Sequence, residues 1–181
     1  MHQLPNILTG ARFAVIPFLL YCLQPEASKT VILVGFTLYT IGAITDWFDG
    51  YLARRMNAVS SFGKLMDPLA DKLFMASVLI MLIPMERVPA VVAFLIIARE
   101  LVVTGLRGVA AAQGLVISAS PLGKYKSVAQ VLSLGFLMFP LGILPFDPHF
   151  IGTILLYLAL VLTIISGLEY VFRFKQVYVD D

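Results

Sequence analysis

Long apolar stretches, separated by short polar segments, dominate this chain. In a helix, about 20 consecutive and mostly apolar residues are needed to cross a bilayer, and six stretches approach or exceed that length. Their bounds are Ile7–Leu23, Thr30–Ala53, Gly63–Pro84, Val88–Ala112, Ser127–Leu144 and Phe150–Phe172. The pattern predicts an all-α integral membrane protein with six transmembrane helices.

The overall composition supports the same interpretation. Of the 181 residues, 60% are hydrophobic and only 13% are charged, whereas soluble domains are about 45–50% apolar. Such a chain has more apolar surface than a core of its size could bury. The polar breaks are short, so we expect residues 1–181 to form a single membrane domain with no separate soluble part.

The basic residues indicate how the chain is oriented in the membrane. If the first helix starts in the cytoplasm, eleven of the 13 lysines and arginines lie on or near the cytoplasmic side, and only Lys29 and Arg87 lie in the opposite loops. Because cytoplasmic segments are enriched in Lys and Arg, we expect a multi-pass cell-membrane protein with both termini in the cytoplasm. The net charge of +2 does not suggest a nucleic-acid partner, whereas a basic rim suits membrane lipid head groups.

Four aspartates occur where the second apolar stretch ends and the third begins: Asp46, Asp49, Asp67 and Asp71. A carboxylate in a bilayer costs about 2.5–3.5 kcal/mol on insertion scales, so four require compensation. Spacings of three and four place each pair on one helix face, and antiparallel helices would bring the two pairs to the same depth. Aspartates at helix ends are also common as caps.

The ligand types point to a particular class of metal ion. Oxygen-only ligands suit hard divalent cations, and the lack of nearby Cys or His argues against zinc or copper. Four carboxylates are enough for two such ions. We therefore expect two divalent cations, Mg²⁺ or Mn²⁺, at these aspartates.

The spacing of this acidic segment resembles, without a departure, the motif of the CDP-alcohol phosphatidyltransferases. The matching string is Asp46-x2-Asp49-Gly50-x2-Ala53-Arg54-x8-Gly63-x3-Asp67-x3-Asp71. The similarity extends over nearly the whole chain, and its other elements are Asn6-x2-Thr9-x2-Arg12, Ala98-Arg99-Glu100 and Gly123-Lys124-x-Lys126. It is strongest to the bacterial members whose acceptor is glycerol 3-phosphate.

The resemblance implies a six-helix homodimer with a polar cavity that faces the cytoplasm. There, two divalent ions and CDP-diacylglycerol would bind, and the phosphatidyl group would pass to glycerol 3-phosphate with release of CMP, a step of phospholipid biosynthesis. The implied metal ligands are Asp46, Asp49, Asp67 and Asp71, of which Asp71 would also take the acceptor proton. The implied contacts to the CDP-lipid are Asn6, Thr9, Gly50, Ala53, Arg54, Ser60 and Gly63.

Four cations on the same side form the candidate acceptor site: Arg99, Arg107, Lys124 and Lys126. Charge-assisted hydrogen bonds from Lys and Arg are the usual means of holding a phosphate, so we expect these residues to bind the phosphate of glycerol 3-phosphate. The alternative is structural: Arg99 and Glu100 would partner other buried groups, and the lysines would contact only lipid phosphate.

Two further functions are compatible with the acidic segment. A sister transferase would use the same motif with phosphatidylglycerol, serine or inositol phosphate as acceptor. A divalent-cation transporter would need polar groups at successive depths across the bilayer, whereas the outer halves of these stretches are almost wholly apolar. This distribution of polar residues, confined to one end of the stretches, favours a pocket closed at its outer end.

Overall fold

The computed structural model describes residues 4–56, 61–112, 114 and 120–179. Within these ranges the only regular secondary structure is α-helix, which confirms the predicted all-α class. The six helices are α1 (Leu4–Cys22), α2 (Lys29–Met56), α3 (Ser61–Leu82), α4 (Ala90–Ala112), α5 (Pro121–Met138) and α6 (Pro148–Val179).

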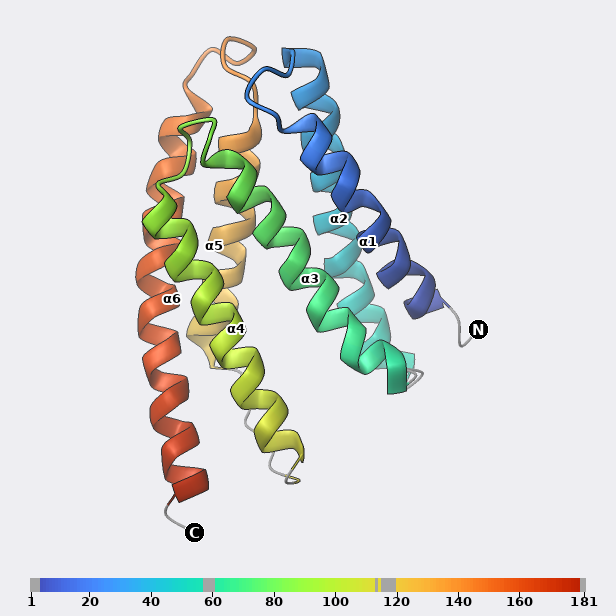
Figure 1. The fold of residues 1–181 in the computed structure, drawn as a ribbon, viewed down its shortest axis with the longest axis vertical. Helices are drawn as coiled ribbons and strands as arrows, with labels where there is room; N and C mark the ends of the chain where they lie inside the picture. Colours follow the sequence, from blue (N-terminus) through green and yellow to red (C-terminus); the bar gives the residue numbers. More distant parts are fainter. Residues whose placement is uncertain (1–3, 57–60, 113, 115–119, 180–181) are drawn as a thin grey trace.

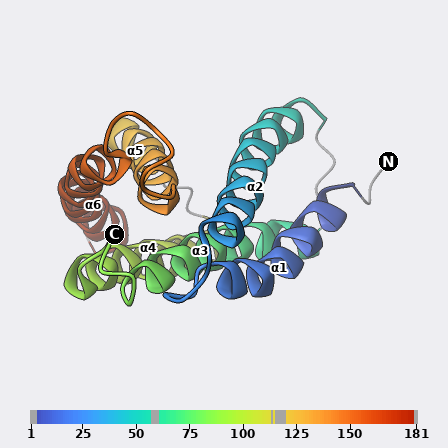
Figure 2. The ribbon, with the colours of Figure 1, turned by 90° about the horizontal axis from the view of Figure 1, so that it is seen from above.

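The helices run up and down between two ends of the molecule (Figure 1). The connections 23–28, 83–89 and 139–147 lie at one end, which we call the loop end. The opposite end, which we call the motif end, holds the starts of α1, α3 and α5 and the last turns of α2, α4 and α6. In Figure 2, α1, α3 and α4 lie side by side in one layer, and α2 and the α5–α6 pair lie on the same face of that layer.

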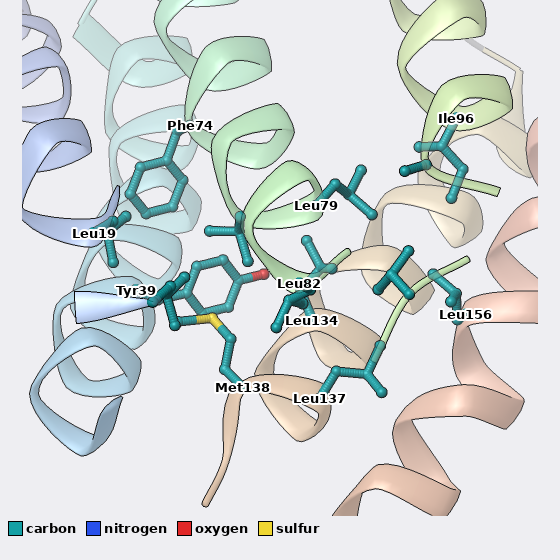
Figure 3. Close-up of a cluster of buried hydrophobic side chains, with 14 of the residues drawn as sticks. Leu19, Tyr39, Phe74, Leu79, Leu82, Ile96, Leu134, Leu137, Met138 and Leu156 are labelled. Carbon is teal, nitrogen blue, oxygen red and sulfur yellow. The ribbon is translucent and has the colours of Figure 1, made fainter. Parts of the chain in front are cut away.

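The apolar core draws side chains from all six helices (Figure 3). Fully or almost fully buried members include Leu19, Tyr39, Phe74, Leu79, Leu82, Ile96, Leu134, Leu137, Met138 and Leu156. In a membrane, lipid is as apolar as these side chains, so close packing and hydrogen bonds between helices supply the stability. Tyr39 shows both, because its ring stacks on Phe74 with centroids 5.6 Å apart and its hydroxyl donates to the Val131 carbonyl at 3.0 Å.

Helix α5 lies six residues earlier in the chain than predicted, at both ends. The Ser120 side chain accepts a hydrogen bond from the Gly123 N–H at 3.3 Å, and Pro121 occupies the first helical turn, which are favourable residues at these positions. The helix ends where Phe139 becomes extended (φ −63°, ψ 132°), since a residue before a proline, here Pro140, avoids the helical region. As a result, Lys124 and Lys126 lie inside the helix.

One helical segment among the described residues, Pro148–Lys175, is both long and apolar enough to cross a membrane, with a mean hydropathy of 2.4. Gly10–Cys22 and Lys29–Thr45 are shorter apolar helical segments. In α3 and α4, charged residues interrupt the apolar sequence, among them Asp71, Lys72, Arg99 and Glu100. The six helices are thus confirmed, and their six crossings of the bilayer stay a prediction.

Candidate functional site

A close contact fixes how α2 and α3 face each other above the acidic motif. A Cβ atom added at Gly42 would lie 2.8 Å from the Phe74 ring, so the glycine leaves room for this ring against the α2 backbone. The same Phe74 ring stacks on Tyr39, one turn earlier in α2. The two contacts set the register of an antiparallel helix pair.

This register places the aspartates of the two helices at matching depths. From the Gly42–Phe74 contact, Asp46 and Asp71 are four and three residues closer to the motif end, and Asp49 and Asp67 are both seven residues closer. At about 1.5 Å per residue, these steps correspond to about 5 Å and about 10 Å along the helices. The two pairs thus lie at matching depths, and their convergence stays a prediction.

Of the four aspartate side chains of the motif, the structure describes only that of Asp71. It is half-buried, and those of Asp46, Asp49 and Asp67 lie outside the described side chains. Among the described residues, no three acidic, His or Cys side chains come together as a metal site. The donor set of the motif, carboxylate oxygen only, nevertheless fits a hard divalent cation.

Lys72 connects Asp71 to a second carboxylate that the motif does not include. Its ammonium lies 3.4 Å from Asp71 Oδ2 and 2.7 Å from Glu100 Oε2 on α4. Only the second distance is that of a good charge-assisted hydrogen bond. The stronger partner of Lys72 is therefore Glu100.

Glu100 gathers cations from three helices around one buried carboxylate. It is 7% exposed and, besides Lys72 of α3, it pairs with its neighbour Arg99 at 3.2 Å and with Lys126 of α5, which is 2% exposed. A buried carboxylate survives only where such partners compensate its lost hydration. We call Lys72, Arg99, Glu100 and Lys126 the Glu100 cluster.

Helix α6 completes this cluster through Arg99. The Arg99 Nη2 donates to Ser166 Oγ at 2.9 Å, and Gly167 leaves room for the Arg99 stem, because a Cβ there would lie 3.0 Å from Arg99 Cγ. Arg99 Nε and the nearby Tyr170 hydroxyl are buried without a hydrogen-bond partner among the described residues. With Asp71 included, three cations face two carboxylates, which leaves one positive charge in excess.

The four predicted acceptor residues occupy different environments. Lys126 points inward to Glu100, whereas Lys124, two residues earlier and thus about 200° around the helix, is exposed. Arg107 is exposed and its guanidinium lies 5.2 Å from the centre of the Tyr170 ring. Arg99 has partners within the protein, as the structural alternative supposed. Lys126 also has a partner within the protein, whereas that alternative supposed lipid phosphate for it. Arg107 and Lys124 present their charge at the surface.

The predicted CDP-lipid residues lie near the motif end as far as their backbone is described. Asn6 and Thr9 fall in the first turns of α1, Gly50, Ala53 and Arg54 in the last turns of α2, and Gly63 at the start of α3. Ser60 lies outside the described residues. The assignments of all seven stay predictions.

The sequence analysis did not single out Lys72 or Ser166. Lys72 could have been noticed as a cation next to Asp71 within an apolar stretch, where an unpaired charge is costly. Ser166 carries no comparable signal, because a serine in an apolar helix is common.

The described structure is a bundle of six helices, one of them long and apolar enough to cross a membrane, with a buried cluster of paired charges among its helices. The family model of the CDP-alcohol phosphatidyltransferases matches residues 2–165. The chain belongs to this family, so it is a transferase, and the resemblance of its acidic motif is confirmed.

Curated relatives cover almost the whole chain. The CDP-diacylglycerol–glycerol-3-phosphate 3-phosphatidyltransferase of Bacillus subtilis (strain 168) is 41% identical over 183 residues, covering 94% of each chain. The protein of the same name from Rickettsia typhi is 41% identical and covers 94% of this chain and 96% of its own. The probable phosphatidylglycerophosphate synthase of Mycobacterium tuberculosis (strain H37Rv) is 37% identical, covering 94% of this chain and 81% of its own.

Proposed function

We propose that the chain transfers the phosphatidyl group of CDP-diacylglycerol to glycerol 3-phosphate, yielding phosphatidylglycerophosphate and CMP. The observation that carries this proposal is the 41% identity, over nearly the full length, to relatives named for that reaction. The family match over residues 2–165 favours a transferase over a divalent-cation transporter. The three cations around the single carboxylate of Glu100 favour an acceptor with a phosphate group over serine.

The acidic motif would hold the metal ions. Asp46, Asp49, Asp67 and Asp71 would bind two divalent cations, Mg²⁺ or Mn²⁺, which supply charge neutralisation at the diphosphate. The support is the depth match of the two aspartate pairs on α2 and α3. At the same end, Asn6, Thr9, Gly50, Ala53, Arg54, Ser60 and Gly63 would contact the CDP-lipid.

The transfer requires one bond to form and one to break. The acceptor hydroxyl attacks the phosphorus that carries the diacylglycerol, the bond from that phosphorus to the oxygen of CMP breaks, and CMP leaves. Asp71 would accept the hydroxyl proton, since its carboxylate is partly exposed and a carboxylate can act as a general base.

The acceptor phosphate would bind between α4 and α5. The exposed cations Arg107 and Lys124 would meet it first, and Arg99 and Lys126 would contribute their charge from the Glu100 cluster. Excess positive charge in a partly buried site attracts an anion more strongly than the same charge in water.

The orientation in the membrane follows from the charge distribution. We propose six crossings with the motif end in the cytoplasm. Lys29 and Arg87 lie at the loop end, whereas the other basic residues lie nearer the motif end or in helices that end there. In the cytoplasm, the CDP head group of the lipid substrate and water-soluble glycerol 3-phosphate would both be accessible. A homodimer, as the family resemblance implies, would cover part of the exposed apolar helix surface.

One assay tests the function directly. Purified protein is mixed with CDP-diacylglycerol, Mn²⁺ or Mg²⁺, and each of glycerol 3-phosphate, serine, inositol phosphate and phosphatidylglycerol, and CMP release is measured. We expect release with glycerol 3-phosphate and its loss when the metal is chelated. Preference for another acceptor would overturn the acceptor assignment, and release of no CMP with any acceptor would overturn the activity.

A further inference from the structure

We propose that Glu100 is a positioning residue that holds the Lys72 ammonium away from Asp71, so that the Asp71 carboxylate can bind a divalent cation. The inference rests on the proposed function, since it assumes a metal site at the acidic motif. It gives a role in that site to a carboxylate on α4, outside the motif.

Glu100 and Asp71 share Lys72 unequally. Its Nζ lies 2.7 Å from Glu100 Oε2 and 3.4 Å from Asp71 Oδ2. The shorter distance is a hydrogen bond, and the longer one exceeds the usual range of N–H···O bonds. Without the Glu100 charge, Asp71 would be the one carboxylate left within reach of Lys72 among the described residues.

Lys72 and a metal ion would compete for the same group, the Asp71 carboxylate. Lys72 directly follows Asp71 in α3, and its ammonium lies 3.4 Å from that carboxylate. A cation tethered in this way lowers the apparent affinity of any other cation for the same site, because that cation must first displace it. Glu100 offers Lys72 an alternative partner and thereby reduces the competition.

Glu100 is itself held in place by other side chains. Lys126 and Arg99 bind its Oε1, which leaves Oε2 directed at Lys72. Arg99 is tied in turn to Ser166 of α6. Side chains from α4, α5 and α6 therefore set the position of the atom that holds Lys72.

The experiment measures metal binding without catalysis. Wild type, Glu100→Gln, and Glu100→Gln with Lys72→Met are purified in phosphatidylcholine nanodiscs, and free Mn²⁺ is counted by electron paramagnetic resonance. The matched control is Glu169→Gln, which neutralises another ion-paired carboxylate, 2.6 Å from Arg173, outside the Glu100 cluster.

We expect Glu100→Gln to weaken Mn²⁺ binding about tenfold, the lower range for a hydrogen bond between charged groups. Adding Lys72→Met should restore binding to the wild-type value, because the competing ammonium is gone. Glu169→Gln should bind like wild type. A residue that served only the packing of the helices would not be rescued by removing Lys72.

Each other outcome counts against the proposal. Unchanged binding in Glu100→Gln, or weakened binding that Lys72→Met does not restore, overturns it. If Glu100→Gln does not fold, the double variant decides: folded protein with wild-type Mn²⁺ affinity supports the proposal, and anything less overturns it. Absence of Mn²⁺ binding by the wild type would instead refute the proposed metal site, on which the inference depends.

Discussion

Asp49 lies on α2 at the same depth as Asp67 on α3, and we assign both to the metal site. Asp49→Asn removes the charge with almost no change in volume. We expect kcat to fall on the order of 100-fold, because charge stabilisation by a bound cation would be lost, while the amount of folded protein in the membrane stays the same.

The measurement is CMP release at saturating metal, normalised to folded protein. Asp147→Asn is the matched control, because Asp147 lies at the loop end and its side chain accepts a hydrogen bond from the His149 N–H at 2.8 Å, which an asparagine oxygen can also do. Nearly normal turnover of Asp49→Asn would remove Asp49 from the set of ligands.

Lys124 is the exposed cation of the proposed acceptor site on α5. Lys124→Gln keeps most of the side-chain length and removes the charge. We expect the apparent KM for glycerol 3-phosphate to rise about tenfold, from loss of one charged contact to phosphate, and the KM for CDP-diacylglycerol to change little, since the proposed CDP-lipid residues belong to α1, α2 and α3.

Lys29→Gln, an equally exposed lysine at the start of α2 and thus at the loop end, should leave both constants unchanged. An unaltered KM for glycerol 3-phosphate in Lys124→Gln would show that this lysine does not bind the acceptor. Lys126 is a poorer test, because removing its charge also disturbs Glu100.

At the scale of helices, the start of α5 decides where Lys124 and Lys126 point. Ser120 caps this start, and replacing a Ser cap by Ala costs about 1 kcal/mol. We expect Ser120→Ala to lower the thermal midpoint of the purified protein by about 2–4 °C.

Ser127→Ala provides the comparison within the same helix. The Ser127 hydroxyl donates to the Gly123 carbonyl at 3.1 Å, a bond that adds little to a helix, so this variant should melt like wild type. Equal midpoints for Ser120→Ala and wild type would show that Pro121 and the tertiary packing suffice to start α5.

The sequence predicted the helices better than it predicted their ends. All six predicted stretches correspond to a helix, because an apolar run of this length suits a helix in lipid. The bounds of α5 were wrong because apolarity alone marked them, whereas the cap at Ser120 and the proline at Pro140 set them. Turn chemistry was the stronger signal at this helix.

At the scale of the whole molecule, the two ends should lie on opposite sides of the membrane. In a Cys22→Ser background, a cysteine at Glu26, in the exposed connection at the loop end, should react with an impermeant thiol reagent added to intact cells. A cysteine at Ala112, the exposed last residue of α4, should react only after the membrane is opened.

Equal folding of both variants is checked first by their amount in the membrane fraction. The reverse labelling pattern would place the motif end outside the cell, away from cytoplasmic CDP-lipid and glycerol 3-phosphate. Labelling of both positions from outside would contradict a membrane crossing between them.

The sequence by itself determined the all-helical class, the six helices and the family, because these depend on local composition and on the order and spacing of motif residues. Only the tertiary structure decided that Lys126 faces Glu100 and that Lys72 joins Glu100 to Asp71. These contacts depend on how each helix is rotated about its axis. Apolar residues surround the helices on many sides, including exposed ones, so no polar face reveals that rotation in advance, and it is set by the packing of the helices against one another.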